Sequence, residues 1–114
     1  RCWSVFDTIS SGVAIYKAIE EGEDFEFLDL NGYAERIEKI KKEDVIGKRL
    51  TDIFPGVEQF GLLEVLRRVW KTGKPETHPV TLYKDDRIQG LRENQVYKLS
   101  TGDIVAVYNN IPEE

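Results

Sequence analysis

Cysteine, histidine and methionine are almost missing from this sequence of 114 residues, which has one cysteine, one histidine and no methionine. The single thiol, Cys2, has no partner for an internal disulfide, and this favours a reducing, cytoplasmic setting. Zinc sites need several Cys or His ligands, and the chain offers only Cys2 and His78. The composition therefore predicts neither a disulfide framework nor a metal centre.

Long apolar runs are missing as well. The longest, such as Ile104–Val107, have four residues, whereas a transmembrane helix needs roughly twenty. The opening residues, Arg1 to Ser4, do not begin a secretory signal peptide, because no long apolar stretch with a small-residue cleavage site follows them. We expect no membrane span in this segment, although a longer parent chain can hold spans elsewhere.

Basic patches and catalytic motifs are also missing. The formal net charge of −5 is spread along the chain, and the basic clusters 39–42 and 67–68 stand beside acids of similar number. Nucleic-acid binding, which needs Lys and Arg gathered on one face, is therefore not expected. The serines lack a histidine partner in sequence context, and no glycine-rich phosphate loop precedes Lys48 or Lys74. The chain itself is predicted not to be an enzyme.

The sequence does contain a regular series of β and α patterns. Runs of β-branched and aromatic residues predict strands, and apolar residues three or four positions apart predict helices. Strands are expected at 13–19, 25–30, 77–83, 96–99 and 104–108, and helical segments at 31–40, 43–46, 52–54 and 57–72. Five strands with every helix in one insertion predict an α+β fold, in which the helices cover one face of an antiparallel sheet and leave the other bare.

Capping residues mark the ends of these helical segments. Asn31 is expected to cap the first helix through its side-chain oxygen, and Thr51 to cap the third short turn. Gly47 and Gly73 are expected to end the second turn and the long helix, because glycine readily takes the left-handed conformation at a helix end.

The last two strands are joined by a turn at Thr101-Gly102. A two-residue loop fixes the facing pairs as Leu99 with Ile104, Tyr97 with Ala106, and Gln95 with Tyr108. Gln95, Tyr97 and Tyr108 are then expected on one sheet face. If that face looks at the helices, the two phenols either offer hydrogen bonds to a ligand or fill the core and bond to backbone or water.

Two stretches resemble the PAS, or sensory box, family. Asn31–Ile37 is similar to the family's asparagine-led first helix, and Lys42–Pro55 to its glutamate-rich turn closing on Ile-Gly-Lys and the short turn after it. The resemblance runs from about residue 5 to residue 111 and implies a PAS fold, with sheet order 2-1-5-4-3 and a helical insertion between strands 2 and 3. It implies a single PAS domain over 1–114, with a helical N-terminal flanking segment at 1–11 and the core at 12–111.

The resemblance also implies a function. PAS domains are sensory and regulatory modules, so we expect part of a cytoplasmic signalling protein, such as a two-component histidine kinase or a nucleotide cyclase, with the effector domain outside this chain. A small ligand is expected between the sheet and the helices. The expected pocket residues are Tyr16, Phe27, Leu63, Leu66, Leu82, Gln95, Tyr97, Ala106 and Tyr108. The signal is expected to leave through Asn110 and Ile111, where many relatives have Asp-Ile-Thr and this chain continues with Pro112.

Two cofactors of the family are not implied by this sequence. Haem-binding relatives usually carry their histidine on the long helix, whereas His78 stands at the start of a strand and is interpreted as structural. Flavin-binding relatives with covalent photochemistry hold a cysteine in the helical insertion, where this chain has none. The ligand's identity stays open. Glu93 has the same parity as Tyr97, so it either enters the core beside Arg36 or a ligand, or stays solvated.

A second hypothesis is a ligand-free dimerisation or protein-interaction module. Trp3, Val5, Phe6 and Ile9 have rough helical spacing, and a free tail has little reason to be so apolar. In this reading the chain forms a homodimer through the N-terminal segment or the bare sheet face.

Overall fold

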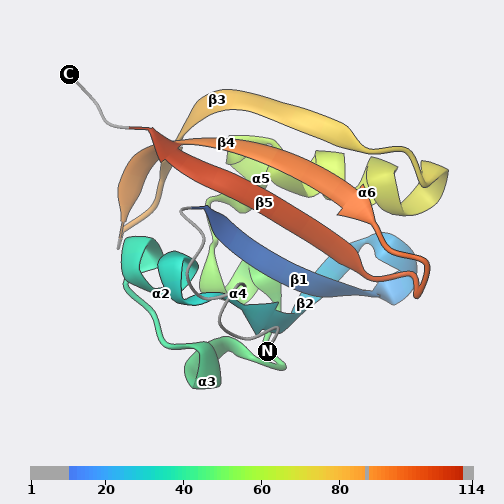
Figure 1. The fold of residues 1–114 in the computed structure, drawn as a ribbon, viewed down its shortest axis with the longest axis horizontal. Coiled ribbons are helices and arrows are strands. Elements are labelled where there is room, and N and C mark those ends of the chain that lie inside the picture. Colours follow the sequence, from blue (N-terminus) through green and yellow to red (C-terminus); the bar gives the residue numbers. More distant parts are fainter. Residues whose placement is uncertain (1–10, 87, 112–114) are drawn as a thin grey trace.

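The computed structural model describes residues 11–86 and 88–111, which form an antiparallel sheet with helices packed on one face (Figure 1). The strands are β1 (Gly12–Ile19), β2 (Asp24–Leu30), β3 (Glu76–Lys84), β4 (Gln89–Lys98) and β5 (Ile104–Ile111). They lie in the order β2-β1-β5-β4-β3, and every neighbouring pair is antiparallel. The predicted α+β fold and strand order are therefore confirmed.

The helices form one insertion between β2 and β3. They are α2 (Gly32–Glu38), α3 (Lys42–Val45), α4 (Leu50–Ile53), α5 (Val57–Phe60) and α6 (Leu62–Thr72), while a 3-10 turn, η1 (Glu20–Gly22), joins β1 to β2. In Figure 1, α5 and α6 lie behind β3 and β4. The insertion is also tied to the sheet edge, because Phe27 on β2 exchanges backbone hydrogen bonds with Gly47 and Lys48, of 2.9 and 3.0 Å.

Asn31 caps α2 as predicted, and its side chain does more than cap. Its Oδ1 accepts from the backbone N–H of Ala34 and from that of Val13 on β1, both at 3.0 Å, and its Nδ2 donates to the carbonyl of Ser11 at 2.9 Å. The side chain is fully buried. It therefore fixes the start of the insertion to the first strand.

The hydrophobic core lies between the sheet and the insertion. Its fully buried members include Phe25 and Phe27 from β2, Leu63 and Leu66 from α6, and Ile104 from β5. Three pocket candidates, Leu63, Leu66 and Ala106, are part of this packed core. Among the described residues, nothing covers much of β3 and β4 on the other sheet face, where Leu82 and Tyr97 are exposed.

The predicted register of the last hairpin is wrong by one residue. Lys98 pairs with Ile104, Val96 with Ala106, and Asn94 with Tyr108. The connection is longer than two residues because Leu99 N–H donates to the carbonyl of Asp103, which closes a wider turn over 99–103. Since side chains alternate along a strand, a shift of one residue turns every side chain to the other face.

Two helix predictions also need correction. The expected helix over 57–72 is broken at Gly61, whose φ of 97° ends α5 and starts α6. Thr51 does not cap α4, which begins at Leu50 after Arg49. The Thr51 hydroxyl instead donates to Asp24 Oδ2 at 2.8 Å. The left-handed stop at Gly73 is confirmed.

The N-terminal predictions fall mostly outside the described residues. The predicted helical segment 1–11 lies outside the described residues apart from Ser11. So do Cys2 and the apolar residues Trp3, Val5, Phe6 and Ile9. Among residues 11–86 and 88–111, no helix is both long and apolar enough to span a lipid bilayer.

Candidate functional site

A small cavity of about 40 Å³ lies between the sheet and the helical insertion. Most of its wall is apolar and includes Phe27, Phe54 and Phe60. Polar side chains enter it from both layers: Glu38 from α2, and Tyr16, Arg92, Asn94 and Tyr108 from the sheet. Sites for small molecules typically have this composition, an apolar wall with a few convergent polar groups. The cavity is therefore the candidate functional site.

An ion pair between Glu38 and Arg92 dominates the chemistry of the cavity. Arg92 Nη2 donates to Glu38 Oε1 at 2.9 Å, and the two side chains are only 8% and 5% exposed for Glu38 and Arg92. Removing two charges from water costs free energy that their attraction offsets only when the geometry is good and other hydrogen bonds help. A buried pair is thus a costly feature for a core that could be filled by apolar side chains.

Two tyrosines lie beside this ion pair. The Tyr108 hydroxyl is hydrogen-bonded to Glu38, and burial, followed by the negative charge of Glu38, raises the pKa of Tyr108. Burial and the same carboxylate also raise the pKa of Tyr16. Both phenols therefore stay protonated at neutral pH and can donate hydrogen bonds into the cavity.

The rim of the cavity on the α5 side depends on Tyr83 and Asp85. The Tyr83 hydroxyl donates to Asp85 Oδ2 and accepts from the backbone N–H of Gly56 at 3.3 Å. Burial and then Asp85 raise the pKa of Tyr83. These contacts connect the segment before α5 to the end of β3.

His78 lies behind this rim and does not line the cavity. Its Nε2 lies 2.9 Å from the carbonyl of Phe60, so that nitrogen carries the proton and donates. Burial lowers the pKa of His78, which keeps the ring neutral. The ring also packs against that of Phe60, with 4.6 Å between centroids. These contacts agree with the interpretation of His78 as structural.

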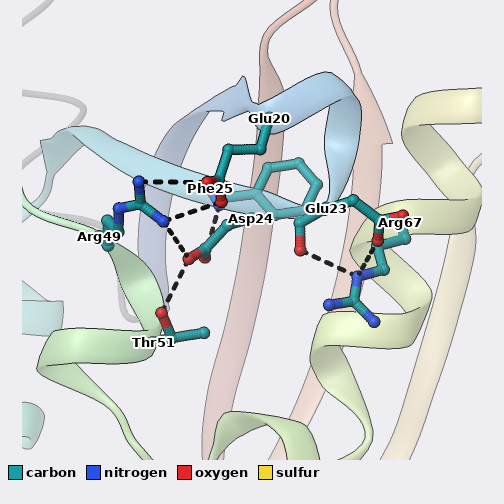
Figure 2. A network of polar contacts seen from close by, with 7 residues as sticks. All are labelled: Glu20, Glu23, Asp24, Phe25, Arg49, Thr51 and Arg67. Carbon is teal, nitrogen blue, oxygen red and sulfur yellow. Dashed lines mark hydrogen bonds and ion pairs between the residues drawn. The ribbon is translucent and has the colours of Figure 1, made fainter.

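The connection between β1 and β2 contacts the insertion through a network of polar side chains around Asp24 (Figure 2). Asp24 accepts from Thr51 at the start of α4 and lies 3.4 Å from Arg49, which also pairs with Glu20 at 2.8 Å. Figure 2 shows Arg67 of α6 reaching the same turn, where its Nε donates to the carbonyl of Glu23 at 3.0 Å. The connection between β1 and β2 is thereby fixed to α4 and α6.

The predicted pocket residues fall into three groups. Tyr16, Phe27 and Tyr108 line the cavity. Leu63, Leu66 and Ala106 are buried beside it without lining it. Leu82, Gln95 and Tyr97 lie on the opposite sheet face, because of the one-residue register shift in β4 and because Leu82 pairs with the outward-facing Leu91. Those last three placements are wrong.

The same shift decides between the two alternatives for Glu93, which does not enter the core. Arg92 and Asn94 point inward and are buried, while Glu93 lies on the outer side. Glu38 was missed altogether, although it follows the buried Ala34 by four residues and so shares its helix face. The signal-exit candidates, Asn110 and Ile111, end β5, where their backbones pair with Arg92 and Leu91.

The size of the cavity limits what it holds in this conformation. A volume of about 40 Å³ accommodates water, and a haem or flavin needs the core side chains to move apart. The part of the chain that the structure describes contains no group of three or more His, Cys, Asp or Glu side chains placed to hold a metal ion.

Comparison with known proteins finds matches among solved structures. No protein-family model matches the chain, and no curated protein does. A domain of the sensory box sensor histidine kinase/response regulator from Geobacter sulfurreducens matches with a TM-score of 0.71 and 17% identity, over 93% of this chain and 88% of that one. The PAS domain of nitrogen regulation protein NR(II) from Vibrio parahaemolyticus matches with a TM-score of 0.69 and 13% identity, over 96% and 97%.

A third match is the photoactive yellow protein domain from the sensor histidine kinase Ppr of Rhodospirillum centenum. Its TM-score is 0.76 at 10% identity, over 93% of this chain and 96% of that one. Identities this low establish a common fold. The chain has the PAS fold, as its resemblance to that family predicts.

Proposed function

We propose that this PAS-fold chain is a non-catalytic sensory module of a cytoplasmic signalling protein, and that it binds a small ligand in the cavity between sheet and helices. The observation that supports this most is the buried Glu38–Arg92 pair, with Tyr16 and Tyr108, at an otherwise apolar cavity. A core needed only for stability is better served by apolar side chains of similar volume.

The small volume of the cavity gives the ligand a way to signal. Anything larger than a water or two has to push the wall outward, and the wall includes the four-residue helices α4 and α5. Short helices are held by few contacts and open at low free energy. A ligand that binds the expanded packing better shifts the population toward it.

A route for that signal runs through the last strand. Arg92 lines the cavity, and its backbone pairs with Asn110 at the end of β5. An effector in the same parent chain, such as a histidine kinase or nucleotide cyclase domain, would receive the change there. The names of similar structures, several of them from sensor histidine kinases, support the histidine kinase.

Native mass spectrometry with an absorption spectrum, on the protein as purified, tests ligand binding. We expect extra mass that is lost on denaturation, or thermal stabilisation by a member of a metabolite library. A variant of the cavity wall tests where the ligand binds. Val57→Ile adds one methylene group to the wall on α5 and should weaken binding without loss of the fold. A clean apo mass together with no stabilisation by any metabolite contradicts the proposal.

A second candidate function is a ligand-free dimerisation or protein-interaction module. The small cavity favours it, and so does the outer sheet face, where Leu82 and Tyr97 are 45% and 40% exposed among the residues that the structure describes. In that case the signal is a change of quaternary packing.

A further inference from the structure

The side chain of Glu38 occupies a receptor that is suited to a carboxylate. Arg92 donates to it at 2.9 Å, Tyr108 is hydrogen-bonded to it, and Tyr16 lies close enough to sense its charge. We propose that Arg92 and the two phenols form the binding site for a small monocarboxylate ligand, and that Glu38 is a tethered competitor which the ligand displaces. This inference rests on the proposed function, because it names the ligand class of the same cavity.

The donor set favours a carboxylate over other ligands. A guanidinium matches the two oxygens of a carboxylate, and charge-assisted hydrogen bonds of this kind are stronger than neutral ones. Protonated phenols donate without adding charge. A neutral ligand that displaced Glu38 leaves Arg92 buried without an anion, which is costly. The site therefore discriminates against amides and alcohols of the same shape.

The charge of the site favours a single carboxylate. Among the residues that line the cavity, Arg92 is the cation and Glu38 the anion. A dicarboxylate or a phosphate dianion places a second negative charge in an apolar enclosure with no second cation lining it. Burial of that unpaired charge disfavours both. Short-chain acids such as acetate and propionate need the smallest outward movement of the wall of a cavity of about 40 Å³, and they are therefore the ligands expected to bind best.

Glu38 is placed so that it can leave. It is the last residue of α2, and the next residue, Lys39, has a left-handed φ of 57° that ends the helix. The backbone after it has no further helical turn to unwind before α3 begins at Lys42. Because the ligand takes the same Arg92 donor that holds the Glu38 carboxylate, ligand binding and release of Glu38 are one event. That event changes the end of α2 and so reports occupancy to the insertion.

The test is a titration of the full chain with sodium acetate and sodium propionate, followed by NMR of the Arg92 side-chain Nε–H. Acetamide and propionamide serve as neutral isosteres, sodium phosphate as a different anion, and sodium chloride keeps the ionic strength constant. We expect saturable shifts with the two carboxylates and none with the amides or phosphate. Glu38→Gln removes the charged competitor. It should tighten acetate binding by about 10- to 100-fold, because a carboxylate at position 38 no longer occupies the Arg92 site for most of the time.

Two control variants separate the site from the surface. The double variant Glu38→Met/Arg92→Met removes both charges together, so it leaves no unpaired ion in the core and should fold yet bind no acetate. Glu43→Ala removes an exposed carboxylate of α3 and should bind as the wild type does. If Glu38→Gln does not fold, the wild-type titration and the double variant still decide the question.

Each outcome has one meaning. Carboxylate binding that is lost in the double variant and tightened in Glu38→Gln supports the inference. Acetate binding that persists in the double variant overturns it. If a neutral molecule copurifies or binds and carboxylates do not, the ligand class is wrong while the sensory proposal stands. If neither carboxylates nor any metabolite bind, and the purified protein has a clean apo mass, both proposals fail.

Discussion

Among single residues, Asn31 connects three backbone segments through the hydrogen bonds of its side chain. Its amide accepts from Val13 and Ala34 and donates to Ser11, so it joins the segment before β1, β1 itself and α2. All three partners are backbone groups, and the side chain is fully buried. Each group left without its partner in a buried site costs the free energy of desolvation as well as the lost bond.

We therefore expect Asn31→Ala to lower the free energy of unfolding by about 2–4 kcal/mol, as the sum of a lost cap and unsatisfied buried groups. Urea denaturation followed by circular dichroism measures it. Asn109→Ala is the matched control, because Asn109 accepts a 2.7 Å hydrogen bond from Ser11 at an exposed position and should change stability by about 0.5 kcal/mol or less. Equal losses in the two variants would show that burial of Asn31 contributes nothing.

The buried ion pair shows where reading single residues from sequence succeeds and fails. Glu38 lies one helical turn after Ala34, so its position on the inner face of α2 is readable from spacing. Its partner was not readable. Arg92 turns inward only in the observed register of β4, and 54 residues separate the two side chains. Spacing therefore offered a signal for Glu38 as a core polar group, although Glu38 was not predicted, and only the fold identifies its counter-ion.

Among the elements, the break between α5 and α6 is a feature that the apolar pattern did not predict. The stripe of apolar residues continues across Gly61, which predicts one helix, yet Gly61 takes φ 97° and separates two. A Cβ at Gly61 would lie 3.1 Å from His78 Nε2, the atom that is hydrogen-bonded to the carbonyl of Phe60. The break is therefore held by β3 as well as by the glycine.

A pair of glycine variants tests this. Gly73 has a similar left-handed φ of 74° with nothing within 4 Å of a Cβ, so Gly73→Ala measures the backbone cost alone, expected to be about 1 kcal/mol. Gly61→Ala bears that cost and also displaces His78, so we expect a loss larger by about 1 kcal/mol or more. Thermal or urea denaturation of both variants decides it. If the two losses are equal, His78 yields freely and does not hold the break.

The strand order was predictable because each strand can be recognised from its own run of residues, and the family resemblance supplies the arrangement of the strands. The register of the last hairpin was not, because it depends on the length of the turn. Thr101-Gly102 suits a two-residue loop, but the bond from Leu99 N–H to Asp103 widens the turn to five residues, 99–103. In β3, an irregularity between His78 and Thr81 shifts the alternation again. Both features depend on backbone hydrogen bonds, which an apolar pattern does not encode.

In the whole molecule, the sheet separates two surfaces with different chemistry. The inner face holds the cavity and its ion pair. On the outer face, Ile15, Val105 and Tyr97 lie in register across β1, β5 and β4. This row is only partly covered in the described residues, with Tyr97 40% exposed. Neighbouring apolar side chains on an exposed sheet face are a feature of protein interaction sites.

If the second candidate function holds, this row is the interface of a homodimer. We then expect the wild type to self-associate, and Val105→Lys/Tyr97→Lys to weaken the association about tenfold or more, because charges at the centre of an apolar interface are left desolvated. Sedimentation velocity over a range of protein concentrations measures the association constant. Ile46→Lys is the matched control, since Ile46 is 39% exposed at the end of α3 in the helical insertion and is not part of the row on β1, β5 and β4, and should leave association unchanged. A wild type that stays monomeric throughout, or a double variant that associates as the wild type does, removes the outer face as the dimer interface. Because the row and the cavity lie on opposite faces of one sheet, loss of association with intact carboxylate binding would assign the two faces separate functions.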